Sequence, residues 1–298
     1  MNLSVEPSHL MLLGASPVMR LLREQLQTLA PVPFTVRIEG ERGTGKGVAA
    51  RLLHDWSPRC AGPFISQPLT LLAPGFEFAR LVGWTRGAYT GATGESAGAF
   101  ESAHAGTLLL DEIVHANAQS QGALLQLVED GVVSRLGERR PRHVNVRLVV
   151  ATNANLAAAV RAGAFRDDLL DRLGSLIVRM PALREHPEDM PELAAHALAL
   201  AARRVERDPP ALSGAELAAL ARASWPGNVR DLENAMIHKV VYDRLPDYLS
   251  LGAMAEHWRD RFPEVLANHQ GNKSAAAREL GISRQTLHAE LRSRTAPV

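Results

Sequence analysis

Apolar residues along the chain fall into short continuous runs and longer stretches with helical spacing. Residues 17–30 carry apolar side chains on one face of a predicted helix, which Pro31 ends. Further helices are predicted at 48–56 and 119–130, and strands at Phe34–Ile38, Phe64–Ile65, Thr107–Leu110, Val146–Ala151 and Leu176–Val178. Short strands that alternate with helices indicate an α/β domain with a parallel sheet covered on both faces.

The pattern changes after Pro181, beyond which the sequence predicts no further strands. Helical spacing at 188–207, 213–224 and 228–244 predicts an all-α subdomain. The next residues contain Pro246 and Gly252 and favour a linker, and a last helical block begins at Glu256. We therefore expect four parts: an α/β subdomain at 1–180, an α-helical lid subdomain at 181–244, a linker at 245–256 and a C-terminal domain at 257–298.

The composition is ordinary for a globular protein in water, since 46% of the 298 residues are apolar and 22% are charged. A net charge of +1 means that nucleic-acid binding would need a local basic patch. Cys60 is the only cysteine, which excludes an intramolecular disulfide and a thiolate metal cluster. The first residues lack the pattern of a secretory signal, and the apolar stretch at 193–202 is too short to span a bilayer. We expect a cytoplasmic protein without membrane insertion.

A glycine-rich turn separates the strand predicted at Phe34–Ile38 from the helix predicted at 48–56. This order of elements places backbone N–H groups around phosphate oxygens at the positive end of a helix dipole. Lys46 supplies charge to the β- and γ-phosphates, whereas Gly47 lacks the hydroxyl that commonly holds Mg²⁺. We predict binding of ATP and Mg²⁺, with nucleotide contacts from Gly40, Glu41, Arg42, Gly43, Thr44, Gly45, Lys46 and Gly47.

Two carboxylates end an apolar strand about 65 residues after Lys46. Asp111 can hold Mg²⁺ directly or through water, and Glu112 can orient or deprotonate an attacking water. Two exposed carboxylates without a catalytic role are the alternative. The apolar residues that lead directly into Asp111 favour the catalytic interpretation, so the sequence predicts nucleotide hydrolysis.

The loop Gly87-Ala88-Tyr89-Thr90-Gly91-Ala92 lies between these two motifs. It holds no metal ligand, nucleophile or general base, but an aromatic ring on a glycine-bounded loop suits contact with a partner. The three motifs together resemble the ATPase module of bacterial sigma-54-dependent transcription activators, a branch of the AAA+ ATPases. In that family the loop carries Phe in place of Tyr89 and pushes on the sigma factor. The resemblance implies contact of all six residues with the sigma-54 RNA polymerase holoenzyme, leading to promoter opening.

The resemblance also implies roles for residues outside these motifs. Thr152 and Asn153 match the family's sensor I, which faces the γ-phosphate, and Arg230 matches sensor II. Arg166 and Arg172 match its arginine-finger segment, which reaches into the site of a neighbouring subunit. A homo-oligomeric ring, in this family a hexamer, is therefore implied. Surface ion pairs with nearby aspartates are the alternative role for both arginines.

The chain departs from the family pattern at three places. Gly47 stands where the family usually has Glu, and Pro68 stands where it has an Asn that pairs with the acidic residue corresponding to Glu112. Proline has neither a side-chain amide nor an N–H. Either Gln67 takes over this role or the nucleotide state is coupled to the loop differently. The third departure precedes the loop, at Trp84-Thr85-Arg86.

The C-terminal block reads as a helix, a turn at Gly281 and a second helix capped by Ser283. Residues 272–287 resemble the factor-for-inversion-stimulation type of helix-turn-helix, which implies binding to upstream activating DNA. Its expected core is Ala276, Ala277, Leu280, Ile282 and Leu287. The expected DNA contacts are Lys273, Ser274, Arg278, Ser283, Arg284, Gln285, Thr286, His288 and Arg292. A helical hairpin used only for dimerisation is the alternative, and Glu290 in the second helix favours it.

The recognisable module begins close to the first residue, at Leu13–Pro17, so we expect no receiver domain. This layout resembles that of the phage shock operon activators, which are controlled by an inhibitory protein in trans. The predicted function is that of an ATP-hydrolysing activator of sigma-54 RNA polymerase. Two alternatives remain: a DNA-binding regulator with an impaired ATPase that acts by occupancy, and a different AAA+ remodelling ATPase.

Overall fold

A computed structural model of the chain describes residues 12–71, 76–89, 92–174, 176–246, 249, 265–269, 272–280, 287 and 291. Its contacts divide the chain into two units at Asp189. The first unit comprises Met1–Asp189 together with Gly227–Val229, and the second comprises Met190–Pro226 with Arg230–Val298. Among the described residues, no helix combines the length and apolar character needed to cross a bilayer.

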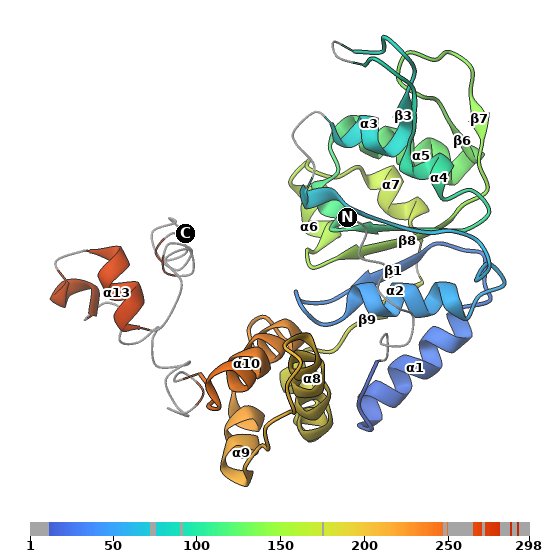
Figure 1. Ribbon diagram of the computed structural model, residues 1–298. Coiled ribbons are helices and arrows are strands. Elements are labelled where there is room, and N and C mark those ends of the chain that lie inside the picture. Colours follow the sequence, from blue (N-terminus) through green and yellow to red (C-terminus); the bar gives the residue numbers. More distant parts are fainter. Residues whose placement is uncertain are drawn as a thin grey trace. The chain divides into compact units, whose positions relative to one another are not determined.

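The first unit is built on a five-stranded parallel sheet with the strand order β2-β5-β8-β1-β9 (Figure 1). The central strands β5 and β8 are buried almost throughout, as expected for parallel strands covered on both faces. All five predicted strands are confirmed, with bounds that differ from the expectation by up to three residues. The observed strands are β1 (Val36–Glu39), β2 (Phe64–Pro68), β5 (Thr107–Asp111), β8 (Arg147–Thr152) and β9 (Ile177–Arg179).

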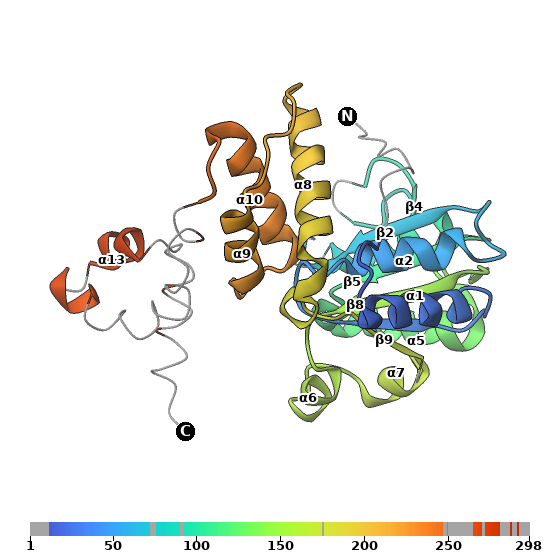
Figure 2. The same ribbon diagram turned by 90° about the horizontal axis from the view of Figure 1, so that it is seen from below.

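Helices cover both faces of this sheet (Figures 1 and 2). Helices α1 (Pro17–Leu29) and α2 (Lys46–Asp55) bury Leu26 and Leu53 against one face. Phe100, Leu124 and Leu169 belong to the core on the other face. That face carries α3 (Glu77–Val82), α4 (Ala99–Ser102), α5 (Ala118–Asp130), α6 (Leu156–Arg161) and α7 (Asp167–Arg172). Short 3₁₀ turns occur at Leu69–Leu71, Ile113–His115, Leu183–Glu185 and Pro187–Asp189.

Two small antiparallel hairpins extend from the α3–α5 side of the sheet and were not predicted from the sequence (Figure 1). One pairs β3 (Gly83–Trp84) with β4 (Ser96–Ala97), and the other pairs β6 (Val132–Val133) with β7 (Arg142–His143). Each strand has only two residues, too few to show alternation of apolar and polar positions. This explains why the periodicity missed them.

A buried guanidinium joins the sheet to the helices on one face. Arg147 lies in β8 with 1% of its surface exposed, although every other residue of the strand is apolar or Thr. Its Nη1 donates to the carbonyls of Ala30 (2.6 Å) and Leu53 (3.0 Å), and its Nη2 donates to that of Leu29 (2.8 Å). These carbonyls belong to the last turns of α1 and α2, where a cation is favoured. Burial lowers the pKa of Arg147 from its usual value.

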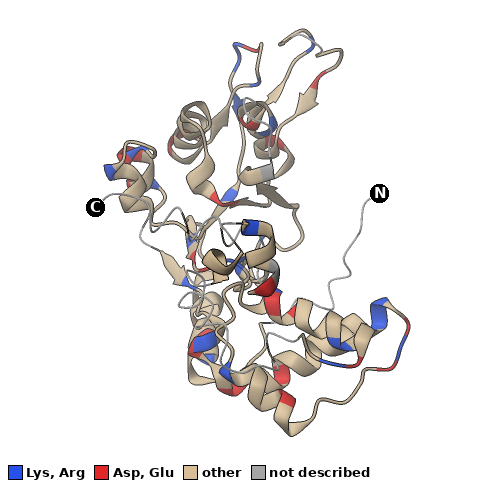
Figure 3. Ribbon diagram, turned by 90° about the vertical axis from the view of Figure 1, so that its left-hand side faces the viewer, with Lys and Arg blue, Asp and Glu red and all other residues tan. Residues whose placement is uncertain are grey.

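The second unit confirms the three predicted helices, α8 (Met190–Arg204), α9 (Gly214–Arg222) and α10 (Val229–Tyr242). Ser213 and Glu216 form a capping box at the start of α9. Glu216 also pairs at 3.0 Å with Lys239 of α10, whose side chain is 7% exposed. Leu245 and Leu249 of the predicted linker are buried. Basic and acidic residues are interspersed along the ribbon, in keeping with the net charge of +1 (Figure 3).

Near the C-terminus, helix α13 (Lys273–Glu279) corresponds to the first predicted helix of the helix-turn-helix. Ala276, Ala277 and Leu287 are buried together, and Leu280 packs against them, as expected for a small core. Lys273 and Ser274 are exposed. The side chain of Arg278 lies outside the description, as do the residues Ile282, Ser283, Arg284, Gln285, Thr286, His288 and Arg292.

The buried guanidinium gives a test of the fold. Arg147→Met removes the guanidinium that donates to three carbonyls in a largely buried place, so we expect the free energy of unfolding to fall by roughly 3 kcal/mol. Thermal unfolding of the full chain measures this loss. The matched control is Arg161→Met at an exposed position, which should change stability by less than about 0.5 kcal/mol. Equal melting temperatures for the two variants would contradict the role given to Arg147.

Candidate functional site

The glycine-rich turn connects β1 to α2 as the sequence predicted. Gly43 and Gly45 have φ angles of 75° and 90°, in the left-handed region that favours glycine. Gly45 is the N-cap of α2, so no side chain covers the first N–H groups of that helix. A Cβ atom on Gly40 would lie 2.8 Å from the Cβ of Met180. The turn is thus shaped to expose backbone N–H groups, the arrangement that binds phosphate.

Lys46 begins α2 and turns back over this loop. Its side chain is 7% exposed, and Nζ donates to the carbonyls of Gly40 (2.9 Å) and Glu41 (3.1 Å). The same ammonium lies 3.6 Å from Oε1 of Glu112. The neighbouring Gly47 has nothing within 4 Å of an added Cβ. Lys46 therefore provides a positive charge between the loop and the acidic end of β5.

Glu112 follows β5 in a strained backbone conformation. It adopts φ 58° and ψ 54°, which a non-glycine residue rarely does, and it is 9% exposed. Its Oε2 accepts from the backbone N–H of Asn153 at 3.2 Å. The preceding residue, Asp111, pairs in register with Ala151 of β8. Such strain persists where surrounding contacts hold it, and it is concentrated at functional sites.

The predicted sensor residues end the neighbouring strand. Thr152 is fully buried and its hydroxyl accepts from the N–H of Ala154 at 3.0 Å, while Asn153 is exposed. Both line a cavity of about 740 Å³ at the carboxyl edge of the sheet, together with Glu39, Gly40 and Glu41. The parallel order therefore brings Lys46, Asp111, Glu112, Thr152 and Asn153 to one edge, as the sequence predicted.

Pro68 lies at the end of β2, where it pairs in register with Asp111. The amide of Gln67 donates to the carbonyl of Pro68 at 3.3 Å. Gln67 thus does not replace the missing Asn as a partner of Glu112. The contacts of that carboxylate come from Lys46 and the Asn153 N–H instead.

Asn228 lies in the stretch 225–230 that resembles sensor II, where a role was predicted only for Arg230, yet Asn228 contacts the phosphate loop. It is fully buried, and its Nδ2 donates to Oε2 of Glu41 (3.1 Å) and to the carbonyl of Arg42 (2.9 Å). Its Oδ1 accepts from the N–H of Leu183 at 2.8 Å. Arg184 forms two further bonds to the Glu41 carboxylate, at 2.6 and 2.8 Å. These donors lower the pKa of Glu41 to about 2, with Arg184 the largest cause.

The predicted arginine fingers pair with acidic residues of their own subunit. Nη2 of Arg166 lies 2.6 Å from Asp168, and Nε of Arg172 lies 2.9 Å from Glu129. Their side chains are 48% and 61% exposed, so these pairs contribute little stability. Both arginines therefore remain accessible to another molecule. Arg230, the predicted sensor II residue, belongs to the second unit, in the first turn of α10.

The predicted partner-contact loop closes the β3–β4 hairpin. Within it, Gly87 N–H donates to the carbonyl of Ala92 (2.9 Å), and Ala92 N–H donates to that of Tyr89 (3.0 Å). The Tyr89 ring packs edge-on against Trp84 and Phe76, with centroids 5.9 and 5.8 Å away. Ala88 is half-buried. Thr90 and Gly91 lie outside the described residues.

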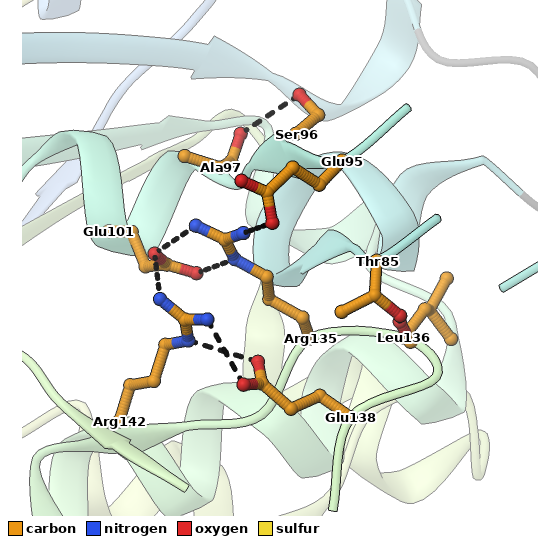
Figure 4. A network of polar contacts seen from close by, with 9 residues as sticks. All are labelled: Thr85, Glu95, Ser96, Ala97, Glu101, Arg135, Leu136, Glu138 and Arg142. Carbon is orange, nitrogen blue, oxygen red and sulfur yellow. Dashed lines mark hydrogen bonds and ion pairs between the residues drawn. The ribbon is translucent and has the colours of Figure 1, made fainter. Parts of the chain in front are cut away.

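The base of this loop is joined to the second hairpin (Figure 4). Thr85 N–H donates to the carbonyl of Leu136 at 2.9 Å. Arg135, 9% exposed, makes two bonds to Glu101 (2.6 and 2.7 Å) and a third to Glu95 (3.3 Å). Arg142 makes two bonds to Glu138, of 2.9 and 3.0 Å. We call these five charged residues, Glu95, Glu101, Arg135, Glu138 and Arg142, the hairpin network.

Two of the residues whose roles were not predicted, Arg147 and Asn228, carry a recognisable signal in the sequence. Arg147 interrupts an apolar strand, and a charged side chain in such a place needs buried partners. Asn228 follows Gly227, a pair typical of left-handed turns. The hairpin network had no such signal, because its partners are up to 40 residues apart.

The described residues contain no group of three or more His, Cys, Asp or Glu side chains arranged to hold a metal ion. A magnesium ion at Asp111 would therefore need oxygen ligands from the nucleotide and from water, which is how Mg²⁺ commonly binds. The chemistry of the carboxylate fits that ion, and the loop fits an anion.

Comparison with known proteins identifies the family. The sigma-54 interaction domain matches residues 12–179, and an AAA+ ATPase lid domain matches residues 184–278. The transcriptional regulatory protein ZraR of Escherichia coli is 35% identical over 308 residues, covering 97% of this chain and 70% of ZraR. The C4-dicarboxylate transport regulator DctD of Pseudomonas aeruginosa is 37% identical over 301 residues, covering 97% and 65%.

Two solved structures are similar to this chain over nearly its whole length. NtrX from Brucella abortus in complex with ADP has a TM-score of 0.76 at 27% identity, covering 96% of this chain and 70% of that one. Its complex with ATP has a TM-score of 0.73 at 28% identity, covering 96% and 69%. With its phosphate loop, its sigma-54 interaction domain and its AAA+ lid, this chain belongs to the family of sigma-54-dependent transcriptional activators.

Proposed function

We propose that the protein hydrolyses ATP and uses the energy to remodel sigma-54 RNA polymerase holoenzyme at a promoter. The observation that carries this proposal is the placement of two features on one α/β unit. The loop 87–92 belongs to the same unit as Lys46 and Glu112, and a sigma-54 interaction domain spans both. An ATP-binding edge and a partner loop in one compact unit suit a motor that acts on a protein.

At the carboxyl edge of the sheet, the phosphate loop binds the triphosphate of ATP through its N–H groups and Lys46. Asp111 would hold Mg²⁺, which when bound neutralises charge on the phosphate oxygens. Glu112 orients the attacking water and accepts its proton, since its carboxylate is held by Lys46 and the Asn153 N–H. Thr152 and Asn153 lie beside this position to register the γ-phosphate.

Hydrolysis needs a second subunit in this proposal. Arg166 and Arg172 are exposed on their own subunit, where they pair with Asp168 and Glu129. In a ring, by family resemblance a hexamer, they would exchange these carboxylates for the γ-phosphoryl group of a neighbour. A guanidinium in that position contributes roughly 10³–10⁵ in rate. Arg230 would reach the nucleotide of its own subunit as sensor II.

The partner loop acts through Tyr89 and Thr90. In the structure the Tyr89 ring packs on Trp84 and Phe76 rather than extending freely. Contact with sigma-54 would exchange this packing for burial on the partner. The hairpin network links the loop to the segment that leads into β8, the strand that ends in Thr152 and Asn153. This is a physical route from the nucleotide edge to the loop.

The C-terminal block would bind upstream DNA as a helix-turn-helix, since α13 and its small core match the first part of that motif. By resemblance of the stretches 40–46 and 145–153 to the phage shock operon activators, the activity would be restrained by an inhibitory protein in trans. The rival function is a regulator that acts by DNA occupancy with an impaired ATPase. Gly47 and Pro68 favour that alternative because neither supplies the polar group usual at its position.

Promoter opening on a sigma-54 template with ATP tests the main proposal. Lys46→Ala should lower ATP turnover by on the order of 10²-fold or more and abolish opening, because the phosphate charge loses its buried partner. Thr90→Ala should abolish opening yet retain ATP hydrolysis. DNA binding by the wild type without any ATP turnover or opening would instead support the occupancy regulator.

Complementation tests the arginine fingers. Arg172→Ala should lower kcat by roughly 10³-fold or more. Mixing it with Lys46→Ala, which keeps its fingers, should restore part of the hydrolysis, because mixed rings contain complete sites. Turnover per subunit of the wild type should also rise with protein concentration. If mixing restores no hydrolysis and turnover does not depend on protein concentration, the arginines form surface ion pairs only and are not fingers.

The hairpin network predicts a separation of hydrolysis from opening. Glu101→Gln removes the charge that faces the buried Arg135 guanidinium, so the two hairpins should lose their fixed relation. We expect promoter opening to fall at least about tenfold while ATP turnover stays within about twofold. The control is Arg51→Gln, which breaks a half-exposed pair with Asp55 on α2. Opening and hydrolysis that fall together would argue against a coupling role.

A further inference from the structure

We infer that Asn228 is a positioning residue for ATP binding: its buried amide holds the phosphate loop in shape and holds the Glu41 carboxylate away from the triphosphate. This inference rests on the proposed ATPase function. It assigns a positioning role to Asn228, which lies two positions before the proposed sensor II residue Arg230.

Every polar group of the Asn228 side chain is engaged. One Nδ2 hydrogen is donated to Glu41 and the other to the carbonyl of Arg42, while Oδ1 accepts from Leu183 N–H. The backbone adds a fourth bond, since Val229 N–H donates to the carbonyl of Gly43 at 3.0 Å. A fully buried amide with all its bonds made is costly to replace. Three consecutive loop residues are thus held from one short segment.

The backbone at Asn228 is suited to this docking. Its φ of 53° lies in the left-handed region, where Asn is several-fold enriched over most other residues. This conformation turns the chain so that the side chain and the next N–H both face the loop. Glycine would adopt the same backbone without strain but would lack the amide. The choice of Asn over Gly therefore points to the side-chain bonds.

The charge of Glu41 explains why these bonds affect nucleotide binding. Glu41 lines the cavity at the nucleotide edge, and with a pKa of about 2 it is ionised at neutral pH. A carboxylate next to a triphosphate repels it. Arg184 compensates the charge of Glu41, and the bond from Asn228 to Oε2 helps to fix the direction of the carboxylate. Without Asn228, both the loop shape and this orientation are weakened.

The position also links the loop to the next helix along the chain. Helix α10 begins at Val229, and Arg230 follows within its first turn. A shift of Gly43 when phosphate binds would be felt at the start of this helix, because the Gly43 carbonyl accepts from the Val229 N–H.

Nucleotide affinity and turnover of the full-length chain test the inference. In Asn228→Gly the Kd of a fluorescent ADP analogue and the KM for ATP should rise about tenfold, with kcat within about threefold, because binding is lost uniformly. Asn228→Asp keeps the acceptor for Leu183 but places a second carboxylate at Glu41, so its Kd should rise further. Combining it with Glu41→Gln restores one acid and one amide, and should recover at least half of the lost affinity on a logarithmic scale.

The matched control is Asn117→Gly. Asn117 also bridges a backbone N–H, that of Ser120, and a carboxylate, that of Glu77, but it caps α5 and does not line the cavity that Glu41 lines. It should lower the melting temperature without changing Kd. The wild type tests the proposed function separately, because failure of the wild type to bind ADP defeats that function. The inference alone is overturned if the wild type binds ADP and both Asn228→Gly and Asn228→Asp keep its Kd within twofold. It is also overturned if adding Glu41→Gln does not recover the affinity lost in Asn228→Asp.

Discussion

The buried guanidinium of Arg147 is the interaction on which the geometry of the nucleotide edge depends. It lies in β8 and bonds to carbonyls at the ends of α1 and α2. Helix α2 begins with Lys46, and β8 ends with Thr152. One side chain therefore joins the helix that begins with Lys46 to the strand that ends with Thr152. Removing a charge from such a buried position is costly, because three hydrogen bonds to carbonyls at the ends of α1 and α2 are lost with it.

Next to that frame, the carboxylate proposed to be catalytic is held by α2 and by the residue that follows β8. Glu112 adopts a left-handed backbone and binds Lys46 and the Asn153 N–H. Pro68 offers no side-chain amide and Gln67 bonds to the neighbouring carbonyl, so β2 provides no switch for this residue in the described structure. A phosphate group that draws Lys46 toward itself would free one side of the Glu112 carboxylate. The nucleotide state would then be read at the lysine and at β8.

The two hairpins show how a short loop gains a defined direction. Strands of two residues contribute few hydrogen bonds, and an isolated pair of this size is unstable in water. The bonds between Thr85 and Leu136, and the pairing of Arg135 with Glu101, supply the missing restraint. A buried ion pair is weak evidence for stability but specifies relative position well. The partner loop is thus restrained at its base by the second hairpin.

The sequence by itself determined the parallel sheet, the longer helices of both units and the nucleotide motif. These depend on periodicity and on short contiguous patterns such as Gly40–Lys46, which local chemistry dictates. It did not reveal the partners of Arg147, Glu112, Asn228 or Arg135, since each bond joins residues far apart in the chain. Asn228 and Glu41, for example, are 187 positions apart. Only the tertiary structure decided which donor meets which buried acceptor, because burial in three dimensions, and not sequence spacing, determines which polar groups must be paired.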